Sequence, residues 1–137
     1  MNQEPKNIVQ DFYNANLSDG VQTFENFLHK DCKLHWSSSK GFNILNRKEI
    51  SNIFKDIEKS YNSVRFHISH LLQDGNFVTT RYTLYVSTIE NIEEEIPLTH
   101  YITIWEIKDN KLYHGHEISQ PADDSVLSLN SFSEIKV

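Results

Sequence analysis

The sequence has few of the residues that define special folds or compartments: among 137 residues it has one cysteine, three prolines and four glycines. A single cysteine, Cys32, excludes an intramolecular disulfide, so no oxidising compartment is required. No apolar run approaches the length of a membrane span, and the first residues lack the basic start and apolar stretch of a signal peptide. We therefore expect a cytoplasmic protein that does not associate with membranes.

Basic residues are also scarce, since 13 Lys and Arg stand against 19 Asp and Glu, for a formal net charge of −6. Nucleic-acid binding needs clustered Lys and Arg to neutralise phosphates, so we expect no nucleic-acid partner. The chain also lacks a glycine-rich phosphate loop and the G-x-S-x-G elbow of serine hydrolases. Its 38% hydrophobic content suits a globular chain with one core. We expect a single domain over residues 1–137, with a core at about 5–120 and a loop-like tail at 121–137.

Apolar residues recur at helical spacing in three segments before the middle of the chain. The first helix starts at Pro5, where the missing N–H is not required, and stops at Ser18 to Gly20. The third has the clearest start, because Asn46 followed by Glu49 forms a capping-box pattern. The expected apolar faces of the second and third helices are Val21, Phe24, Phe27 and Leu28, then Ile50, Ile53, Phe54, Ile57 and Tyr61.

Alternating apolar and polar residues predict strands in the remaining segments. One runs over 32–36 and is followed by a loop at Ser37 to Gly41, and four more lie near 64–72, 78–86, 97–107 and 112–119. Asp74-Gly75-Asn76 is typical of a hairpin turn. The order α-α-β-α-β-β-β-β predicts an α+β fold, with three helices on one face of a curved, mostly antiparallel sheet. Such a layout leaves a cone-shaped cavity, which is a natural site for a small molecule.

Several segments, in this order, resemble the nuclear transport factor 2-like (NTF2-like) superfamily, and within it the SnoaL-like and ketosteroid isomerase-like proteins. The likeness covers about residues 5 to 120. It implies the cone-shaped fold and a homodimer formed through the outer face of the sheet, and no metal or organic cofactor is implied. The segments that carry it are the helix at 8–13, the strand at 31–36, the helix start at 47–50, the turn at 74–78 and the closing hairpin at 109–112.

Matching the reactive positions of these relatives gives a different answer for each group. The ketosteroid isomerase base falls on Trp36 and its tyrosine falls on Phe12, and neither can perform that role, so steroid isomerisation by this mechanism is not expected. SnoaL-like cyclases carry an acid on the last strand, which matches Glu117. A histidine often stands two residues earlier in those cyclases, where this chain has Gly115.

The resemblance directs one face of the last strand into the cavity, and alternation puts Tyr113, Gly115 and Glu117 on that face. A carboxylate in an apolar cavity has a raised pKa, which suits a general acid or base near neutral pH. The simpler alternative for Glu117 is a solvated side chain or an ion pair with Arg81, Lys33 or Arg65. Gly115 would leave room for a ligand beside the acid.

Two further residues are candidates for the catalytic site. His70 stands on the apolar face of the 64–72 strand, where it either relays a proton to Glu117 or is an ordinary hydrogen-bonded core histidine. Tyr82 either donates a hydrogen bond to a ligand carbonyl or packs with its hydroxyl at the rim.

The expected wall of the cavity is apolar and aromatic, which favours a hydrophobic, ring-bearing or acyl ligand. The direction of Trp105 depends on the strand register and stays open. His114 and His116 point to the outer side, where a surface or dimer-interface role is favoured over metal binding. The expected ligand-binding residues are Phe12, Phe27, Trp36, Phe54, Trp105, Tyr113 and Gly115.

Two functions remain open from the sequence. One is a cofactor-independent isomerase, cyclase or dehydratase, with Glu117 as acid or base and with His70 and Tyr82 positioning the ligand. The other is a non-catalytic, ligand-binding or accessory dimer that has lost the catalytic set, which Phe12 and Trp36 at the matched reactive positions favour.

Overall fold

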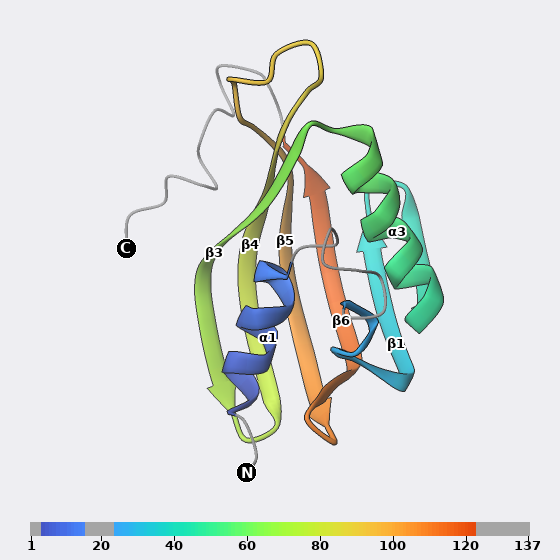
Figure 1. Ribbon diagram of the computed structural model, residues 1–137. Helices are drawn as coiled ribbons and strands as arrows, with labels where there is room; N and C mark the ends of the chain where they lie inside the picture. Colours follow the sequence, from blue (N-terminus) through green and yellow to red (C-terminus); the bar gives the residue numbers. More distant parts are fainter. Residues whose placement is uncertain (1–3, 16–23, 123–137) are drawn as a thin grey trace.

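The computed structural model describes residues 4–15 and 24–122, and over these ranges it contains two helices and six strands (Figure 1). The strand order in the sheet is β2-β1-β6-β5-β4-β3. All neighbouring strands are antiparallel except β1 and β6, so the sheet is mixed. The elements are α1 (Pro5–Asn14), β1 (Leu28–Ser38), β2 (Gly41–Asn46), α3 (Arg47–Ser60), β3 (Ser63–Asp74), β4 (Phe77–Ser87), β5 (Ile96–Lys108) and β6 (Lys111–Pro121).

Both helices begin where the sequence predicts. Pro5 occupies the first turn of α1. At α3 the predicted capping box is formed: the Asn46 side chain accepts from the Glu49 backbone N–H at 2.9 Å, and the Glu49 carboxylate accepts from the Asn46 N–H at 2.9 Å. The helices pack on one face of the sheet (Figure 1). The α+β fold is therefore confirmed.

The predicted second helix lies largely in residues 16–23, outside the described residues. Phe24 and Glu25 are helical, but Phe27 stands in a turn and Leu28 already begins β1, so placing these last two on a helix was wrong. The described chain has two helices rather than three. Tertiary pairing explains the early strand, because Leu28 pairs with Leu112 of β6.

The prediction also missed β2. The serine-rich segment continues β1 to Ser38, and the chain turns at once into Gly41–Asn46, which pairs antiparallel with β1. β2 is an edge strand and all its residues but one are exposed, so it lacks the apolar alternation that marks the other strands.

The last strand, β6, extends to Pro121, and the remainder of the predicted tail, residues 123–137, lies outside the described residues. The closing hairpin turns at Asp109 and Asn110, which both have positive φ angles (55° and 61°). This pair of angles is typical of the two-residue hairpin turn that matches the twist of adjacent strands. Neither described helix is long and apolar enough to cross a membrane.

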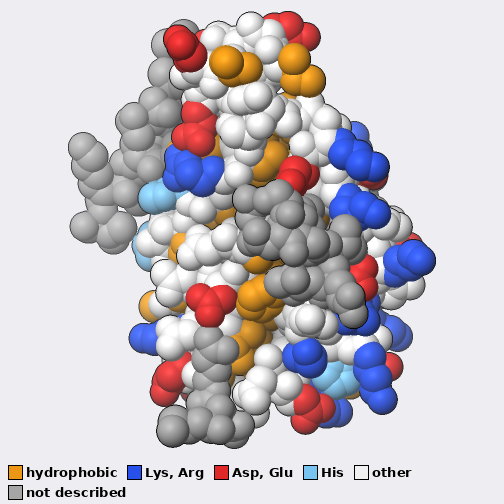
Figure 2. All heavy atoms as spheres, in the orientation of Figure 1, with side chains coloured by type: hydrophobic (Ala, Val, Ile, Leu, Met, Phe, Trp, Pro, Cys, Tyr) orange, Lys and Arg blue, Asp and Glu red, His pale blue; other side chains and the backbone are white. Residues whose placement is uncertain are grey.

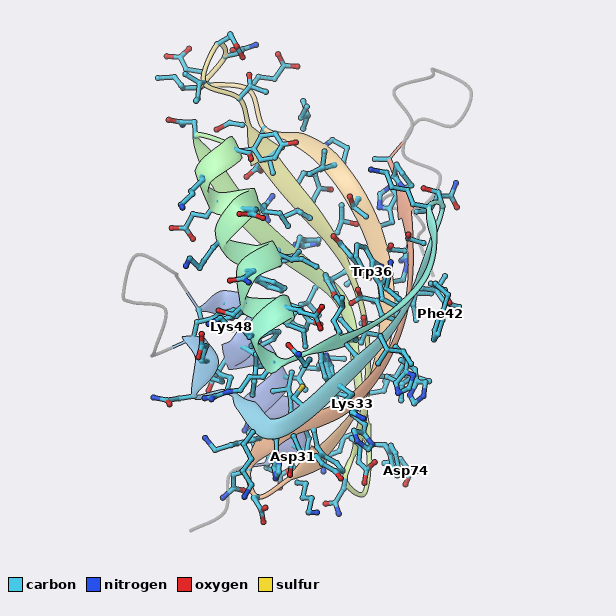
Figure 3. All side chains as sticks on the ribbon, turned by 90° about the vertical axis from the view of Figure 1, so that its right-hand side faces the viewer. Asp31, Lys33, Trp36, Phe42, Lys48 and Asp74 are labelled. Atoms are coloured by element: carbon cyan, nitrogen blue, oxygen red, sulfur yellow. The ribbon has the colours of Figure 1, made fainter. Side chains whose placement is uncertain are left out.

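The sheet has an inner face under the helices and an outer face on the other side. Figure 3 shows Lys48 of α3 on one side and Phe42 of β2 pointing away on the other. The core lies on the inner face, and its largest fully buried side chains include Trp105, Phe12 and Phe24. On the helix-bearing side, Lys and Arg side chains gather over α3, and few histidines are visible (Figure 2).

Candidate functional site

Glu117 is buried in the middle of the sheet on the inner face. Its side chain is 7% exposed, and its neighbours across the strands are Trp36 on β1 and Thr103 on β5. The Tyr82 hydroxyl and the Thr103 hydroxyl each donate to Glu117 Oε1 at 2.7 Å. None of the described residues donates to Oε2, and no described cation pairs with the carboxylate. Among the described residues, the carboxyl group is thus held through Oε1 alone.

The surroundings of Glu117 favour its neutral form. Burial raises the pKa of the Glu117 carboxyl from its ordinary value of 4.5 to about 7, while the hydrogen bonds from Tyr82 and Thr103 limit the rise. Burial and the Glu117 charge also raise the pKa of the Tyr82 hydroxyl well above its ordinary value, so this donor keeps its proton. A carboxyl with this pKa can both release and accept a proton near neutral pH.

A second buried hydroxyl, that of Tyr13 on α1, lies next to this group. The Tyr13 and Tyr82 rings have centroids 4.2 Å apart, and the Trp105 indole N–H donates to the Tyr13 oxygen at 3.0 Å. Burial, followed by the Glu117 charge, raises the pKa of Tyr13 above its ordinary value. Hydrogen bonding with Trp105, Tyr82 and Thr103 limits this rise.

Trp36 borders the other side of the acid. Its indole N–H donates to the Ser119 hydroxyl at 2.7 Å, which fixes the ring beside Glu117 along the parallel β1–β6 pair. Tyr101 stacks on Tyr82 with ring centroids 4.7 Å apart. The acid therefore stands among aromatic side chains, as the sequence predicted.

A small inner pocket, of about 30 Å³, lies between Glu117 and the helices. That volume has room for about one or two water molecules. Of the expected ligand-binding residues, Phe12, Trp36, Phe54 and Trp105 line it, and Tyr82 does so as well. The other lining residues are Tyr13, Leu34, Leu45, Ile50, Ile53, Ile57, Phe66, Tyr101 and Glu117.

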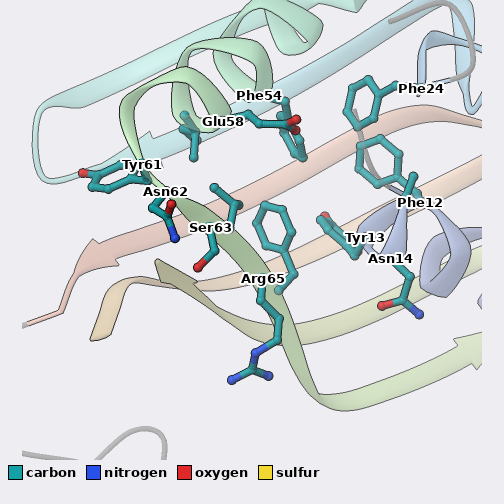
Figure 4. A pocket seen from close by; sticks show the side chains of 14 residues that line it. Phe12, Tyr13, Asn14, Phe24, Phe54, Glu58, Tyr61, Asn62, Ser63 and Arg65 are labelled. Carbon is teal, nitrogen blue, oxygen red and sulfur yellow. The ribbon is translucent and has the colours of Figure 1, made fainter. Parts of the chain in front are cut away.

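A larger outer pocket, of about 480 Å³, adjoins the inner one (Figure 4). The two share Phe12, Tyr13, Phe54, Ile57 and Phe66 as walls. The outer pocket has aromatic side chains toward α1 and polar ones at its other side. The polar residues away from α1 are Glu58, Asn62, Ser63 and Arg65, whereas Asn14 lies at the end of α1 beside Tyr13 (Figure 4).

The structure does not bring His70 to the acid. A β-bulge between Ile68 and His70 inserts Ser69 into β3, so the alternation slips by one residue. His70 is therefore exposed on the outer face, where its Nδ1 lies 2.9 Å from the Ser69 hydroxyl. Leu71 packs on the core in place of Leu72. Assigning His70 to the cavity face was wrong.

A second bulge moves Tyr113 off the expected face. Ile107 of β5 pairs with Leu112 of β6, but its neighbour Glu106 pairs with His114. Tyr113 is therefore an extra residue in β6. Its ring stacks on His114 at 3.9 Å between centroids and does not line the inner pocket.

Gly115 is on the inner face, but it makes room for Trp105 rather than for a ligand. A Cβ atom at this position would lie 2.7 Å from the Trp105 ring and 2.8 Å from Leu34. Trp105 itself is 1% exposed, which resolves its direction as inward. Phe27 packs against Phe12, with centroids 6.0 Å apart, and does not line the inner pocket.

His114 and His116 lie on the outer face, as predicted. His116 stacks on His35 of β1, with ring centroids 4.7 Å apart, and His114 Nδ1 is 4.0 Å from a Glu106 oxygen. In the described ranges, no group of three or more His, Cys, Asp or Glu residues is arranged to hold a metal ion.

Sequence reasoning missed Tyr13 and Thr103. Tyr13 was assigned to the apolar stripe of the first helix, and its hydroxyl gave no separate signal. Thr103 carries no motif, although it stands directly opposite Glu117 once the β5–β6 register is known. A register derived from the Asp109–Asn110 turn, including the bulge at Tyr113, would have found it.

Comparison with known proteins identifies the family. The model of the SnoaL-like domain matches residues 9–114, while none of the curated proteins matches. Among solved structures, the chain is similar to wild-type IdmH, a proposed polyketide cyclase from Streptomyces antibioticus, with a TM-score of 0.70, 13% identity, and coverage of 85% of this chain and 92% of that one.

Two further structures show the same fold at low identity. TerC, co-crystallised with polyporic acid, has a TM-score of 0.61 and 14% identity over 84% of this chain and 91% of that chain. An NTF2-like protein from Burkholderia pseudomallei has a TM-score of 0.60 and 11% identity, over 84% and 90%. The buried acid on the last strand thus stands in an architecture that these structures share, and the chain belongs to the SnoaL-like domain family.

Proposed function

We propose that the protein binds a hydrophobic, ring-bearing organic molecule between the helices and the sheet, and that Glu117 exchanges a proton with it. The reaction class is a cofactor-independent isomerisation, cyclisation or dehydration. The observation that carries the proposal is the buried Glu117 carboxyl, with a pKa of about 7, in the wall of an aromatic pocket. Acids with such perturbed pKa values cluster at functional sites.

The groups around the acid have distinct roles in this proposal. Tyr82 and Thr103 hold Oε1, so Oε2 is the atom that takes or gives the proton. Tyr13 would turn its hydroxyl proton toward a ligand oxygen, while the Trp105 N–H holds the Tyr13 oxygen in place. Such a donor stabilises negative charge that develops on the ligand as the carboxylate removes a proton.

The two adjoining pockets favour an amphipathic ligand. The outer pocket has a volume in the usual range for small-molecule sites and offers polar groups at one side. The ring-bearing part of the ligand would reach Glu117 by displacing Phe54 and Phe66, which belong to both pockets. The presence of polyporic acid with TerC, a structure of the same fold, supports this class of ligand.

A generic proton-abstraction probe tests the proposal without knowledge of the natural substrate. In 5-nitrobenzisoxazole, a base removes the proton on C3 while the ring N–O bond breaks, and the product is a cyanophenolate that absorbs visible light. We expect catalysed turnover that rises with pH through about 7, as Glu117 loses its proton. Glu117→Gln should lower the catalysed rate about 100-fold or more.

The matched control is Glu106→Gln, which removes an outer-face carboxylate from the neighbouring strand. This variant should retain the full rate. Wild-type protein without turnover, or a Glu117→Gln variant that turns over the probe as fast as wild type, would refute proton transfer by Glu117.

The small inner pocket favours a second candidate, a non-catalytic ligand-binding module. A space of about 30 Å³ is smaller than a ring-bearing molecule, so in this case the ligand occupies only the outer pocket. The fluorescent probe 1-anilinonaphthalene-8-sulfonate would then bind equally to wild type and Glu117→Gln, with no turnover by either. Weaker binding of this probe by Phe66→Ala would show that the probe lies against the wall that the two pockets share.

We also propose a homodimer through the outer face of the sheet. Five side chains of this face, Phe42, Ile44, Ile102, Ile104 and Ile118, are 44–69% exposed although they are large and apolar. Exposed apolar patches commonly mark interaction sites. Sedimentation should show a dimer for wild type and for Ile92→Asp, which changes a loop residue, but a monomer for Ile118→Asp. Dimeric Ile118→Asp would contradict this interface.

A further inference from the structure

Histidine is distributed unevenly over the two faces of the sheet. The chain has seven histidines, all within the described residues, and only His29 lies outside the outer face. Strand alternation and the Ser69 bulge place the others outward. The outer-face histidines are His35, His67, His70, His100, His114 and His116.

His35 and His116 form the centre of this group. They are register partners on β1 and β6, and their rings stack at 4.7 Å between centroids with an interplanar angle of 8°. On the adjacent strands, Ile44 of β2 pairs with His35 and Ile104 of β5 pairs with His116, so the four residues form one row across the sheet. Both isoleucines belong to the exposed apolar residues of this face. The stacked pair therefore stands inside the apolar patch.

We propose that the outer face is a self-association surface controlled by pH, in which protonation of the His35–His116 pair separates two copies of the chain. The inference rests on the proposed homodimer. Two stacked imidazoles pack well against apolar side chains when they are neutral. A charged imidazolium beside Ile104, covered by a second copy, would be a buried charge without a counter-ion.

The register of the sheet makes this face complementary to itself. If two copies pack face to face about a two-fold axis that runs along the strands between β5 and β6, β5 of one copy lies over β6 of the other. Ile118 of one copy is then opposite Ile102 of the other, and His116 is opposite Ile104. The same axis sets His114 opposite Glu106 of the second copy, so these two polar groups face each other rather than an apolar side chain. Apolar groups thus meet apolar groups, and the second copy is the partner that this pattern fits.

The charges that face the stacked pair do not offset its protonation. Lys33 on β1 is the nearest permanent cation by sequence, and β2 contributes no titratable group from Gly41 to Asn46. On β6 and β5, His114 and Glu106 lie against one another. The next row carries Arg81 on β4 and His70 on β3, and neither of these side chains is an anion.

The electrostatic environment of His35 also favours dissociation of the dimer at low pH. Partial desolvation, then His116, His114 and Lys33, lowers the pKa of His35 below its ordinary value. The neutral form is thus favoured on the free face, and cover by a second copy extends the desolvation. Because the dissociated copies bind protons more readily, lower pH favours dissociation by linkage.

Sedimentation equilibrium of the full chain at pH 7.5, 6.5 and 5.5 tests the inference. If each copy takes up one proton on dissociation, the dimer Kd should rise by up to about 100-fold per pH unit as the pH falls below 6.5. The double variant His35→Gln, His116→Gln should remain dimeric with a nearly constant Kd. His67→Gln, a change on the same face at the far strand, should keep the wild-type pH dependence.

The possible outcomes separate the two proposals. A monomer at every pH overturns the homodimer itself. A dimer whose Kd changes less than threefold from pH 7.5 to 5.5, or a double variant that dissociates like wild type, overturns the histidine control and leaves the homodimer standing. Near-UV circular dichroism must show native monomer at pH 5.5, and unfolding in place of dissociation also overturns the control.

Discussion

The inner and outer faces of the same strands treat titratable groups in opposite ways. On β6, Glu117 points inward and is buried, while His116, the residue before it, points outward and is exposed. The buried acid is held by two hydroxyl donors, whereas the outer histidine stacks on another histidine. One peptide unit therefore separates the proposed proton-transfer site from the proposed assembly surface, because adjacent residues of a strand point to opposite faces.

The two faces should differ most in how much a side chain on β5 contributes to the free energy of unfolding. Trp105 and Ile104 are adjacent on this strand and point to opposite faces. Trp105 is 1% exposed and Ile104 is 44% exposed. Trp105→Ala leaves a cavity and removes the donor to Tyr13, so we expect a loss of about 3–5 kcal/mol in the free energy of unfolding. Ile104→Ala should cost less than about 1 kcal/mol in protein dilute enough to be monomeric, because the proposed dimer would cover this side chain. Urea unfolding measures both, and equal losses would contradict the assigned faces.

The next largest effect should be the pH dependence that Glu117 adds to stability. Its pKa is raised in the folded state from 4.5 to about 7, so the protonated carboxyl stabilises the fold fully below pH 4.5. This contribution is lost as the pH rises through about 7, and the shift corresponds to about 3 kcal/mol. Glu117→Gln stays neutral and its oxygen can accept the same two hydrogen bonds.

Relative to wild type, Glu117→Gln should therefore become more stable by about 3 kcal/mol between pH 4.5 and pH 8. Chemical denaturation of both proteins at the two pH values measures this difference, and the other titrating groups cancel in the comparison. Glu106→Gln, on the outer face, is the control and should follow the wild-type profile. If the free energy of unfolding of Glu117→Gln changed with pH in the same way as that of wild type, Glu117 would titrate as an ordinary exposed acid.

A smaller effect should follow from removing one hydroxyl donor. Tyr82→Phe takes away one of the two hydrogen bonds to Oε1, so the pKa of Glu117 should rise further. We expect a loss of about 1–2 kcal/mol at pH 8, where the carboxyl is charged, and a smaller loss at pH 5. Tyr85→Phe, outward on the same strand, should change stability by less than about 0.5 kcal/mol at either pH. Equal losses from the two variants would contradict the role of Tyr82.

The sequence allowed most of the fold, and the alternation of β6 that carries Glu117, to be predicted because their signals are local. The capping pattern at Asn46 and Glu49, the alternation in the strands, and the hairpin turns each depend on neighbouring residues. The faces of His70 and Tyr113 were wrong because single-residue bulges invert the alternation and have no composition signal. Tyr13 and Thr103 were missed because their roles arise only when α1 and β5 meet β6 in space.

The central claim is that Glu117 changes its protonation state near neutral pH inside the aromatic pocket. The most direct test is a pH titration of the side-chain carboxyl carbon by NMR in protein carrying ¹³C-labelled glutamate, with the Glu117→Gln spectrum to assign the resonance. The account predicts a single transition with a midpoint at about pH 7. A midpoint between pH 4 and 5, the range of an ordinary exposed glutamate, would contradict it.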